Sequence, residues 1–319
     1  MRKAIGVDLG GTHVTAAVVG DDGKILSSHE QDLDDHGVEV VLTAMEAVIG
    51  AALDDVKEDG VPIGIGSAGN IDLHSGTILY SPNFQWDNVP LAARLGEKFK
   101  QPIFIGNDAR CATLGEYTYG TGRGTKDFAL LTIGTGIGGG IVSDGTLVLG
   151  NAAGAGEIGH HQIRPSDGFV CNCGKIGCFE AQASGTGLIR HAFAVKPSFP
   201  RSVLLERKPE KLGSKAIRKA AQAGDRHALA AWQNFAADLA IGVANIIAFV
   251  NPEVIALGGG VSSAGEFMLD AISGRVDQLT TMVPKGTTRI AIATLGNDAG
   301  PIGAAVMALR GGLKSGAAA

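Results

Sequence analysis

Three of the four cysteines in this chain fall within eight positions, and two adjacent histidines lie ten residues upstream of them. The residues concerned are His160, His161, Cys171, Cys173 and Cys178, with Gly174 and Gly177 between the last two cysteines. The glycines let the backbone turn tightly between the thiols. Three thiolates and one imidazole form a closed tetrahedral zinc site of the structural type. A local disulfide with a spare thiol is the alternative, but such a cluster in a chain that looks cytosolic favours a metal.

Two carboxylates flank this cluster: Glu157 stands just before the histidines, and Glu180 follows the last cysteine by two residues. A metal loop that holds acidic side chains at its edges could build a pocket for a polyhydroxylated substrate.

Glycine-rich turns follow three predicted strands, at residues 10–12, 134–136 and 258–260. Without side chains, several backbone N–H groups can converge on an anion, and the hydroxyls of Thr12 and Thr135 add donors. Asp8 stands just before the first turn. Taken singly, each turn is as well explained by a plain hairpin, so the phosphate-binding interpretation depends on their repetition. The first two turns match neither the P-loop nor the dinucleotide-binding fingerprint.

Asn107 and Asp108 follow another predicted strand, at the end where open α/β sheets place ligands. One interpretation is a simple helix N-cap. Beside two phosphate-binding turns, Asp108 becomes a candidate general base.

The elements that must position these residues follow from hydrophobic periodicity and turn signals. Strands are predicted at residues 3–9, 13–19, 24–30, 62–66, 103–106, 127–133, 137–142, 146–149 and 253–257, and helices at 38–56, 91–99, 108–119, 187–195, 215–223, 227–249 and 301–309. The order strand, glycine turn, strand, Asp-Gly turn, strand occurs twice, from residue 3 and from residue 127. This repeat predicts two similar α/β halves that each present a glycine turn to a shared cleft. We expect the last helix to pack back on the first half.

Composition limits the classes of protein that this chain could be. Its 319 residues, 45% hydrophobic and 18% charged, suit a well-cored globule of one large or two ordinary domains. A net charge of -5 without a basic patch argues against nucleic acid as a partner. No apolar run approaches the roughly 18 residues of a membrane span, and the first strand begins too early for a signal peptide. We therefore expect a cytoplasmic protein, with no membrane partner and a frayed tail at residues 311–319.

Together these motifs resemble the ROK family of sugar kinases and repressors, within the actin-like and hexokinase-like ATPase superfamily. The chain is most similar to the bacterial ATP-dependent glucokinases of that family. The resemblance covers residues 8–12, 107–109, 131–140, 156–160, 171–180 and 257–261. It implies two ribonuclease H-like α/β domains around a central cleft, with a structural zinc loop. The smaller domain would comprise residues 1–119 and 299–319, and the larger one residues 120–298.

The resemblance also implies residue roles. Asp108 takes the proton of the sugar 6-hydroxyl. The implied sugar contacts are Asn83, Asn107, Asp108, Glu157, His160 and Glu180. The implied ATP contacts are Asp8 near the magnesium ion, Gly10, Gly11, Thr12, Thr135 and Gly136 at the phosphates, and Gly259 and Gly260 at the adenosine. The implied zinc ligands are His160, Cys171, Cys173 and Cys178, whereas His161 lies outside the ligand set.

Three residues depart from the family pattern: His13 replaces a lysine, Ala68 a proline and Arg110 an asparagine. The first could weaken phosphate contact, and the last would put a charge near the cleft and leave the sugar preference open. Cys111, the fourth cysteine, is expected in the core.

The predicted function is transfer of the γ-phosphate of ATP to the 6-hydroxyl of glucose, with structural Zn²⁺ and with Mg²⁺ bound to ATP, in a homodimer or homotetramer. Another hexose, an N-acetylhexosamine or polyphosphate as donor are alternatives within the enzyme class. A sugar-sensing regulator without its DNA-binding domain, or a catalytically silent module, are alternatives of another class. Loss of the zinc is expected to weaken sugar contacts and to leave the phosphate-binding turns in place.

Overall fold

The computed structural model describes residues 1–200, 202, 204 and 212–313, so most of the tail expected to be frayed lies outside the described residues. The chain divides into two compact units. Unit 1 comprises Met1–Lys126, Gly140–Gly156 and Thr294–Ala319, and unit 2 comprises Asp127–Gly139 and Glu157–Ala293. The domain limits predicted from the sequence stay a prediction.

Unit 1 is built on a five-stranded sheet of order β3-β2-β1-β4-β8. Its strands are β1 (Lys3–Leu9), β2 (His13–Gly20), β3 (Ile25–Asp32), β4 (Ile63–Ser67) and β8 (Ile103–Asn107). The first three form an antiparallel meander, while β4 and β8 run parallel to β1. Leu9 pairs with Ser67, and Ser67 with Asn107, so the three parallel strands end at the same edge.

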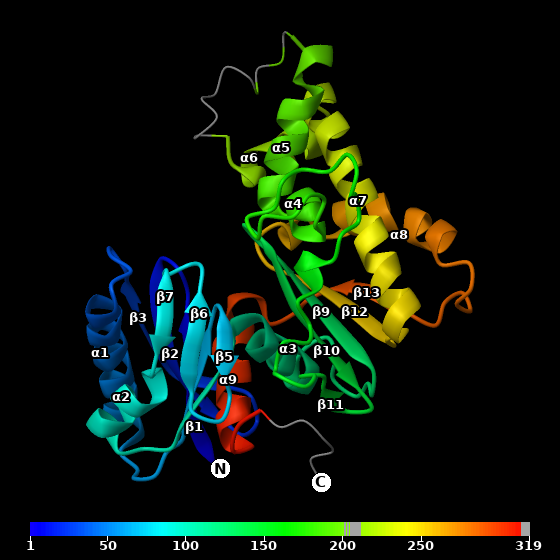
Figure 1. The fold of residues 1–319 in the computed structure, drawn as a ribbon. Coiled ribbons are helices and arrows are strands. Elements are labelled where there is room, and N and C mark those ends of the chain that lie inside the picture. The colour runs from blue at the N-terminus through cyan, green and yellow to red at the C-terminus, as the bar shows by residue number, and fades with distance from the viewer. Residues whose placement is uncertain (201, 203, 205–211, 314–319) are drawn as a thin grey trace. The chain divides into compact units, whose positions relative to one another are not determined.

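Helices cover both faces of this sheet (Figure 1). The helices of unit 1 are α1 (Val38–Val56), α2 (Leu91–Phe99), α3 (Asp108–Tyr119) and α9 (Ala299–Leu309), the last preceded by a 3-10 turn, η6 (Gly296–Asp298). One core joins α1 and α2 to Ile5, Val7 and Leu9 of β1. The other core joins α3 and α9 to the opposite face, as expected for the last helix.

The contact between α9 and the sheet is unusually close, because glycines line it. A Cβ built on Gly6 would lie 1.8 Å from the carbonyl oxygen of Pro301, and one built on Gly64 would lie 1.9 Å from that of Ala304. Glycine is therefore required here for backbone contact between helix and strand, and not only for turns.

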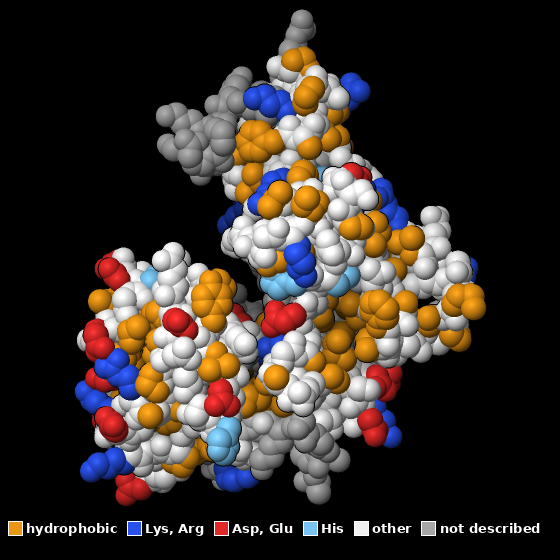
Figure 2. Space-filling model, viewed as in Figure 1, with side chains coloured by type: hydrophobic (Ala, Val, Ile, Leu, Met, Phe, Trp, Pro, Cys, Tyr) orange, Lys and Arg blue, Asp and Glu red, His pale blue; other side chains and the backbone are white. Residues whose placement is uncertain are grey.

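A second, three-stranded sheet in unit 1 was not predicted from the sequence. It has the order β5-β6-β7, with bounds β5 (Asn70–Asp72), β6 (Thr77–Ser81) and β7 (Trp86–Val89). On the face shown in Figure 2, acidic and basic side chains are interspersed around α1 and α2, in keeping with ion pairs such as Lys98–Glu46 and Arg94–Glu39.

The second five-stranded sheet has the order β11-β10-β9-β12-β13. Its strands are β9 (Phe128–Ile133), β10 (Ile137–Ser143), β11 (Thr146–Leu147), β12 (Val254–Gly258) and β13 (Arg289–Ile292). The order is that of the first sheet, with β9, β10, β11, β12 and β13 in the places of β1, β2, β3, β4 and β8, so the predicted repeat and the α/β class are confirmed. Parallel pairing of Thr132 with Gly258 brings the ends of β9 and β12 to one edge.

The helices of unit 2 complete the description. They are α4 (Phe179–Ala183), α5 (Gly185–Val195), α6 (Ser214–Gln222), α7 (Arg226–Val250) and α8 (Glu266–Leu279), with 3-10 turns η1 (Ile158–His160), η2 (Lys196–Ser198) and η5 (Ser262–Ala264). By length and composition alone α7 could cross a membrane, but it contacts α4, α5, α6 and α8 and most of its apolar side chains are buried. It is therefore the core helix of unit 2. Helices α4 and α8 and strand β13 were not predicted from the sequence.

Candidate active site

The carboxyl edge of the first sheet gathers the predicted catalytic and phosphate-binding residues of unit 1. Because β1, β4 and β8 end in register, the first glycine turn (residues 10–12) and Asp108 follow strand ends on the same edge of the sheet. Gly66 of β4 lies between them, and a Cβ there would be 3.4 Å from the Cα of Asp108. Parallel pairing thus brings together residues that are a hundred positions apart in sequence.

Asp8 and Asp108 are close enough to repel one another. The pKa of Asp8 is raised from 3.8 to about 6, first because the carboxyl is buried and second because of the negative charge of Asp108, while His13 acts in the opposite direction. The side chain of Asp8 rests on the start of α9, where a Cβ on Gly300 would lie 2.9 Å from its Cγ. A buried carboxyl whose pKa is raised by a second carboxylate is typical of a functional site.

The first glycine turn is held by its carbonyl groups. His36 Nε2 lies 2.7 Å from the Gly11 carbonyl oxygen, and the amide of Leu33 donates to the carbonyl of Thr12. A Cβ on Gly11 would meet no atom within 4 Å, so this residue faces open space. His36 was missed by sequence reasoning, since a lone histidine before a helix carries no motif.

Asn107 is the N-cap of α3, one of the interpretations of the sequence, and its sugar contact stays a prediction. Its side chain caps α3 by accepting from the Arg110 amide at 3.2 Å, and its Nδ2 lies 3.5 Å from the Gly69 carbonyl oxygen. The predicted sugar contact Asn83 is exposed in unit 1, on a groove of about 510 Å³ that it shares with His36, the residue that contacts Gly11. That groove is also lined by Gly37, Val38, Phe84, Gln85 and Trp86.

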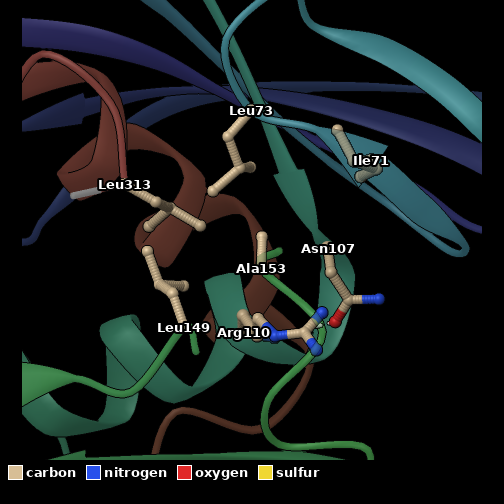
Figure 3. Close-up of a pocket in the computed structure, with 7 residues that line it drawn as sticks. All are labelled: Ile71, Leu73, Asn107, Arg110, Leu149, Ala153 and Leu313. Carbon is tan, nitrogen blue, oxygen red and sulfur yellow. Dashed lines mark hydrogen bonds between the residues drawn. The ribbon is translucent and has the colours of Figure 1, made fainter. Parts of the chain in front are cut away.

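Arg110, a departure from the family pattern, does not project a free charge. It is 4% exposed, and its Nε and Nη2 both donate to the Ala155 carbonyl, at 2.9 and 2.6 Å. Figure 3 shows it beside Asn107, lining a small cavity. The other lining residues are Ile71, Leu73, Leu149, Ala153 and Leu313. Arg110 therefore fastens the segment before residue 156 to α3. Cys111 is fully buried, as expected, and burial raises its pKa.

In unit 2, the second glycine turn (residues 134–136) follows β9, and the third (residues 258–260) follows β12 on the same edge. Gly259 has φ +82°, and a Cβ there would lie 2.6 Å from the Ile133 carbonyl oxygen, so the fold itself requires glycine. A Cβ on Gly260 would meet nothing within 4 Å. The third turn thus combines a structural glycine with one that faces open space.

The predicted metal ligands come together. One donor atom from each of His160, Cys171, Cys173 and Cys178 lies within 4.8 Å of all the others. The Sγ atoms of Cys173 and Cys178 are 3.6 Å apart, and Cys171 Sγ is 3.7 Å from His160 Nδ1. A zinc tetrahedron with Zn–S of about 2.3 Å and Zn–N of about 2.0 Å has edges of roughly 3.5–3.8 Å. The cluster therefore fits a tetrahedral metal, with Nδ1 as the histidine ligand.

One histidine and two carboxylates lie beside the cluster, and the sugar contacts of the carboxylates stay predictions. His161 stays outside the cluster: its Nδ1 lies 2.5 Å from the Ile158 carbonyl oxygen, its ring contacts Phe179, and burial lowers its pKa. Glu157 is exposed at the start of η1. Glu180 is half-buried, and its Oε2 accepts the Ile137 amide at 2.9 Å. Ligands and carboxylates thus lie around one short loop of unit 2.

A duplicated sheet whose strand ends carry glycine turns defines a ribonuclease H-like α/β protein, here with a cysteine–histidine metal loop. Within that class the chain belongs to the ROK family, whose pattern it matches over residues 4–310. The glucokinase of Thermotoga maritima is 39% identical over 307 residues, which cover 95% of this chain and 96% of that protein. The ROK family glucokinase of Streptomyces griseus, solved in complex with glucose and AMPPNP, has a TM-score of 0.84 at 34% identity and covers 97% of this chain and 99% of its own. A ROK family transcriptional regulator, a homologue of the E. coli MLC protein, is also similar, with a TM-score of 0.83 at 26% identity over 95% of this chain and 76% of its own.

Proposed function

We propose that this protein is an ATP-dependent sugar kinase that transfers the γ-phosphate of ATP to the 6-hydroxyl of glucose. The observation that carries the proposal is the carboxylate pair of Asp8 and Asp108 beside the first glycine turn. A glycine turn supplies amides for phosphate, and a carboxylate on the same edge of the sheet supplies a base. The glucokinases among its relatives support the choice of reaction and sugar.

In the proposed mechanism, Asp108 orients the sugar hydroxyl and accepts its proton. Positioning accounts for much of the effect, since phosphoryl transfer passes through a loose transition state. Asp8 would hold a magnesium ion, which when bound offsets the charge of the phosphates. The burial that raises the pKa of Asp8 makes a cation at this position favourable.

The remaining site residues are proposed as follows. Gly10, Gly11, Thr12, Thr135 and Gly136 hold the phosphates, and Gly259 and Gly260 lie against the adenosine. Asn83, Asn107, Glu157, His160 and Glu180 contact sugar hydroxyls. His160, Cys171, Cys173 and Cys178 hold a structural zinc, for which their donor set and spacing fit. We further propose a cytoplasmic homodimer or homotetramer.

A sugar-sensing regulator is the competing function, because a family regulator is among the similar structures. A sensor needs the sugar contacts but has no use for a base or for phosphate-binding turns. In this chain Asp8, Asp108 and both glycine turns are present, which favours the kinase.

The test is a coupled assay of ADP release over a panel of sugars, with ATP or polyphosphate as donor. Glucose should be phosphorylated, whereas 6-deoxyglucose, which lacks the acceptor hydroxyl, should not. Asp108→Asn should lower kcat by about 10² to 10⁴-fold, the usual contribution of a general base. Asp54→Asn, at an exposed position on α1, is the matched control and should behave as wild type. A near-normal kcat in Asp108→Asn would show that Asp108 is not the general base and serves only at the start of α3. Absence of turnover with every sugar in wild type would favour the regulator.

A further inference from the structure

We propose that the metal loop (residues 160–178) positions the second glycine turn for ATP, through the short segment that joins Cys178 to Thr186. Glu180 is the positioning residue of this connection. The inference rests on the proposed function in one respect, that the second glycine turn holds ATP phosphates. In this inference the metal affects the binding of ATP and not only the binding of the sugar.

Three hydrogen bonds fasten the second glycine turn to this segment. The amide of Gly185 donates to the Gly134 carbonyl at 2.8 Å. The hydroxyl of Thr186 donates to the Thr135 carbonyl, also at 2.8 Å. Glu180 Oε2 accepts the amide of Ile137, the residue that follows the turn, at 2.9 Å. The turn is thus held at both ends and in the middle by residues of α4 and α5.

These bonds also set the direction of the turn's amides. In a trans peptide the C=O and N–H groups point in opposite directions. Because the carbonyls of Gly134 and Thr135 point to α5, the amides of Thr135 and Gly136 point away from it. Two adjacent N–H groups aimed in this way are suited to a phosphate oxygen.

The same segment is continuous with the metal loop. Cys178 is the N-cap residue of α4, and its carbonyl accepts the Gln182 amide at 3.3 Å. The amide of Phe179 donates to the His161 carbonyl at 2.8 Å, and the Phe179 side chain is fully buried. The Glu180 carboxylate contacts both sites, since its other oxygen, Oε1, lies 3.7 Å from Cys171 Sγ. Displacement of Cys178 or Cys171 would therefore move the residues that hold the turn.

There is little space for an alternative arrangement around Glu180. A Cβ on Gly136 would lie 2.3 Å from Glu180 Oε2, and one on Gly159 would lie 2.2 Å from the Ile137 carbonyl oxygen. The Glu180 carboxylate thus packs against the glycine turn, and η1, which leads into the metal loop, packs backbone to backbone against the start of β10. In such close packing a small displacement of the metal loop is transmitted to the glycine turn.

The first experiment removes the metal at its exposed ligand, Cys173, whose Sγ lies 3.6 Å from Cys178 Sγ. Cys171, whose Sγ lies 3.7 Å from Glu180 Oε1, is left unchanged. Cys173→Ser should lose its metal by elemental analysis. Hydrogen exchange, measured without nucleotide, should then become at least tenfold faster at the Ile137 amide, while β12 stays protected. Calorimetric titration with a non-hydrolysable ATP analogue should give affinity on the order of fivefold weaker, the loss expected for about one hydrogen bond.

The second experiment leaves the metal in place. Thr186→Val keeps the side-chain volume but removes the hydroxyl that holds the Thr135 carbonyl, and Thr186→Ser restores the hydroxyl. Valine should weaken binding of the ATP analogue by about fivefold, with normal metal content, and serine should bind as wild type. If Cys173→Ser fails to fold, its β12 amides will lose their protection from exchange. The two Thr186 variants then test whether α5 positions the second glycine turn.

Two outcomes would overturn the inference: metal-free Cys173→Ser with wild-type Ile137 exchange and wild-type nucleotide affinity, or identical nucleotide affinity for the valine and serine variants at Thr186. Failure of the proposed function would look different. Wild type would then bind no ATP analogue at all, and the exchange rate of the Ile137 amide would alone report whether the metal loop positions the turn.

Discussion

Replacing Asp8 with asparagine should stabilise the protein at neutral pH. In the folded protein the pKa of Asp8 is raised from 3.8 to about 6 by burial and by the charge of Asp108. A raised carboxyl pKa means that the folded state binds this proton more tightly than the unfolded chain does. Wild-type stability should therefore fall as the pH rises through the window between these two pKa values. Asparagine keeps the shape of the side chain and removes the charge.

The size of the effect follows from the pKa difference. A shift of about two units at about 1.4 kcal/mol each amounts to about 3 kcal/mol at pH 7.5. At pH 4.5, where the carboxyl is mostly protonated in the folded state, the advantage of Asp8→Asn should shrink to about 1 kcal/mol. The gain in stability should accompany a loss of turnover, as is common for strained active sites.

Urea unfolding at fixed ionic strength, from pH 4.5 to 7.5, measures this difference directly. Asp54→Asn, which removes an exposed carboxylate, is the control and should change stability by less than about 0.5 kcal/mol at every pH. A stability difference for Asp8→Asn that did not change with pH, or a loss of stability at pH 7.5, would refute the assignment of a buried, repelled carboxylate.

Three further predictions concern unit 1. Gly11→Val should raise the KM for ATP without changing the melting temperature, because a side chain there meets only open space; an unchanged KM would make the turn merely structural. Gly303→Ala should lower stability by about 1–3 kcal/mol or more in urea unfolding, since its Cβ would lie 1.6 Å from the Cys111 carbonyl oxygen; a neutral effect would contradict the close packing of α9. Glu116→Ala should cost on the order of 1–3 kcal/mol, because the buried carboxylate accepts the Leu295 amide at 2.6 Å; wild-type thermal unfolding would argue against that bond.

Much of this architecture could be predicted because the sequence repeats its own pattern. The glycine turns after β1 and β9 are short-range signals, and each depends on a few adjacent residues. The metal cluster was predictable for the same reason, since Cys171 and Cys178 are close in sequence. The three short strands at residues 70–89 carry weak alternation and were missed. So was α8, although Met268, Ile272 and Val276 are spaced like the buried face of a helix.

What could not be predicted are contacts between distant residues. Glu180 and Ile137 are 43 positions apart, and nothing in either segment indicates the hydrogen bond between them. From the sequence alone, loss of the metal was expected to leave the phosphate-binding turns in place. The bonds of Gly185 and Thr186 to the second glycine turn give a physical reason to revise that expectation.

Because α9 follows α3 only after the whole of unit 2, unit 1 cannot complete its core until α9 has been synthesised. Ala4, Ala17, Val19 and Leu114 form one side of that core, and α9 supplies the other. At about 5–20 residues per second, a ribosome needs on the order of 10–40 s to pass from α3 to α9. Unit 2 ends at Ala293 and can fold before α9 emerges. Unit 1, whose strands β1–β4 are synthesised before unit 2, is thus the last to fold, and its apolar sheet face is exposed to aggregation over that interval.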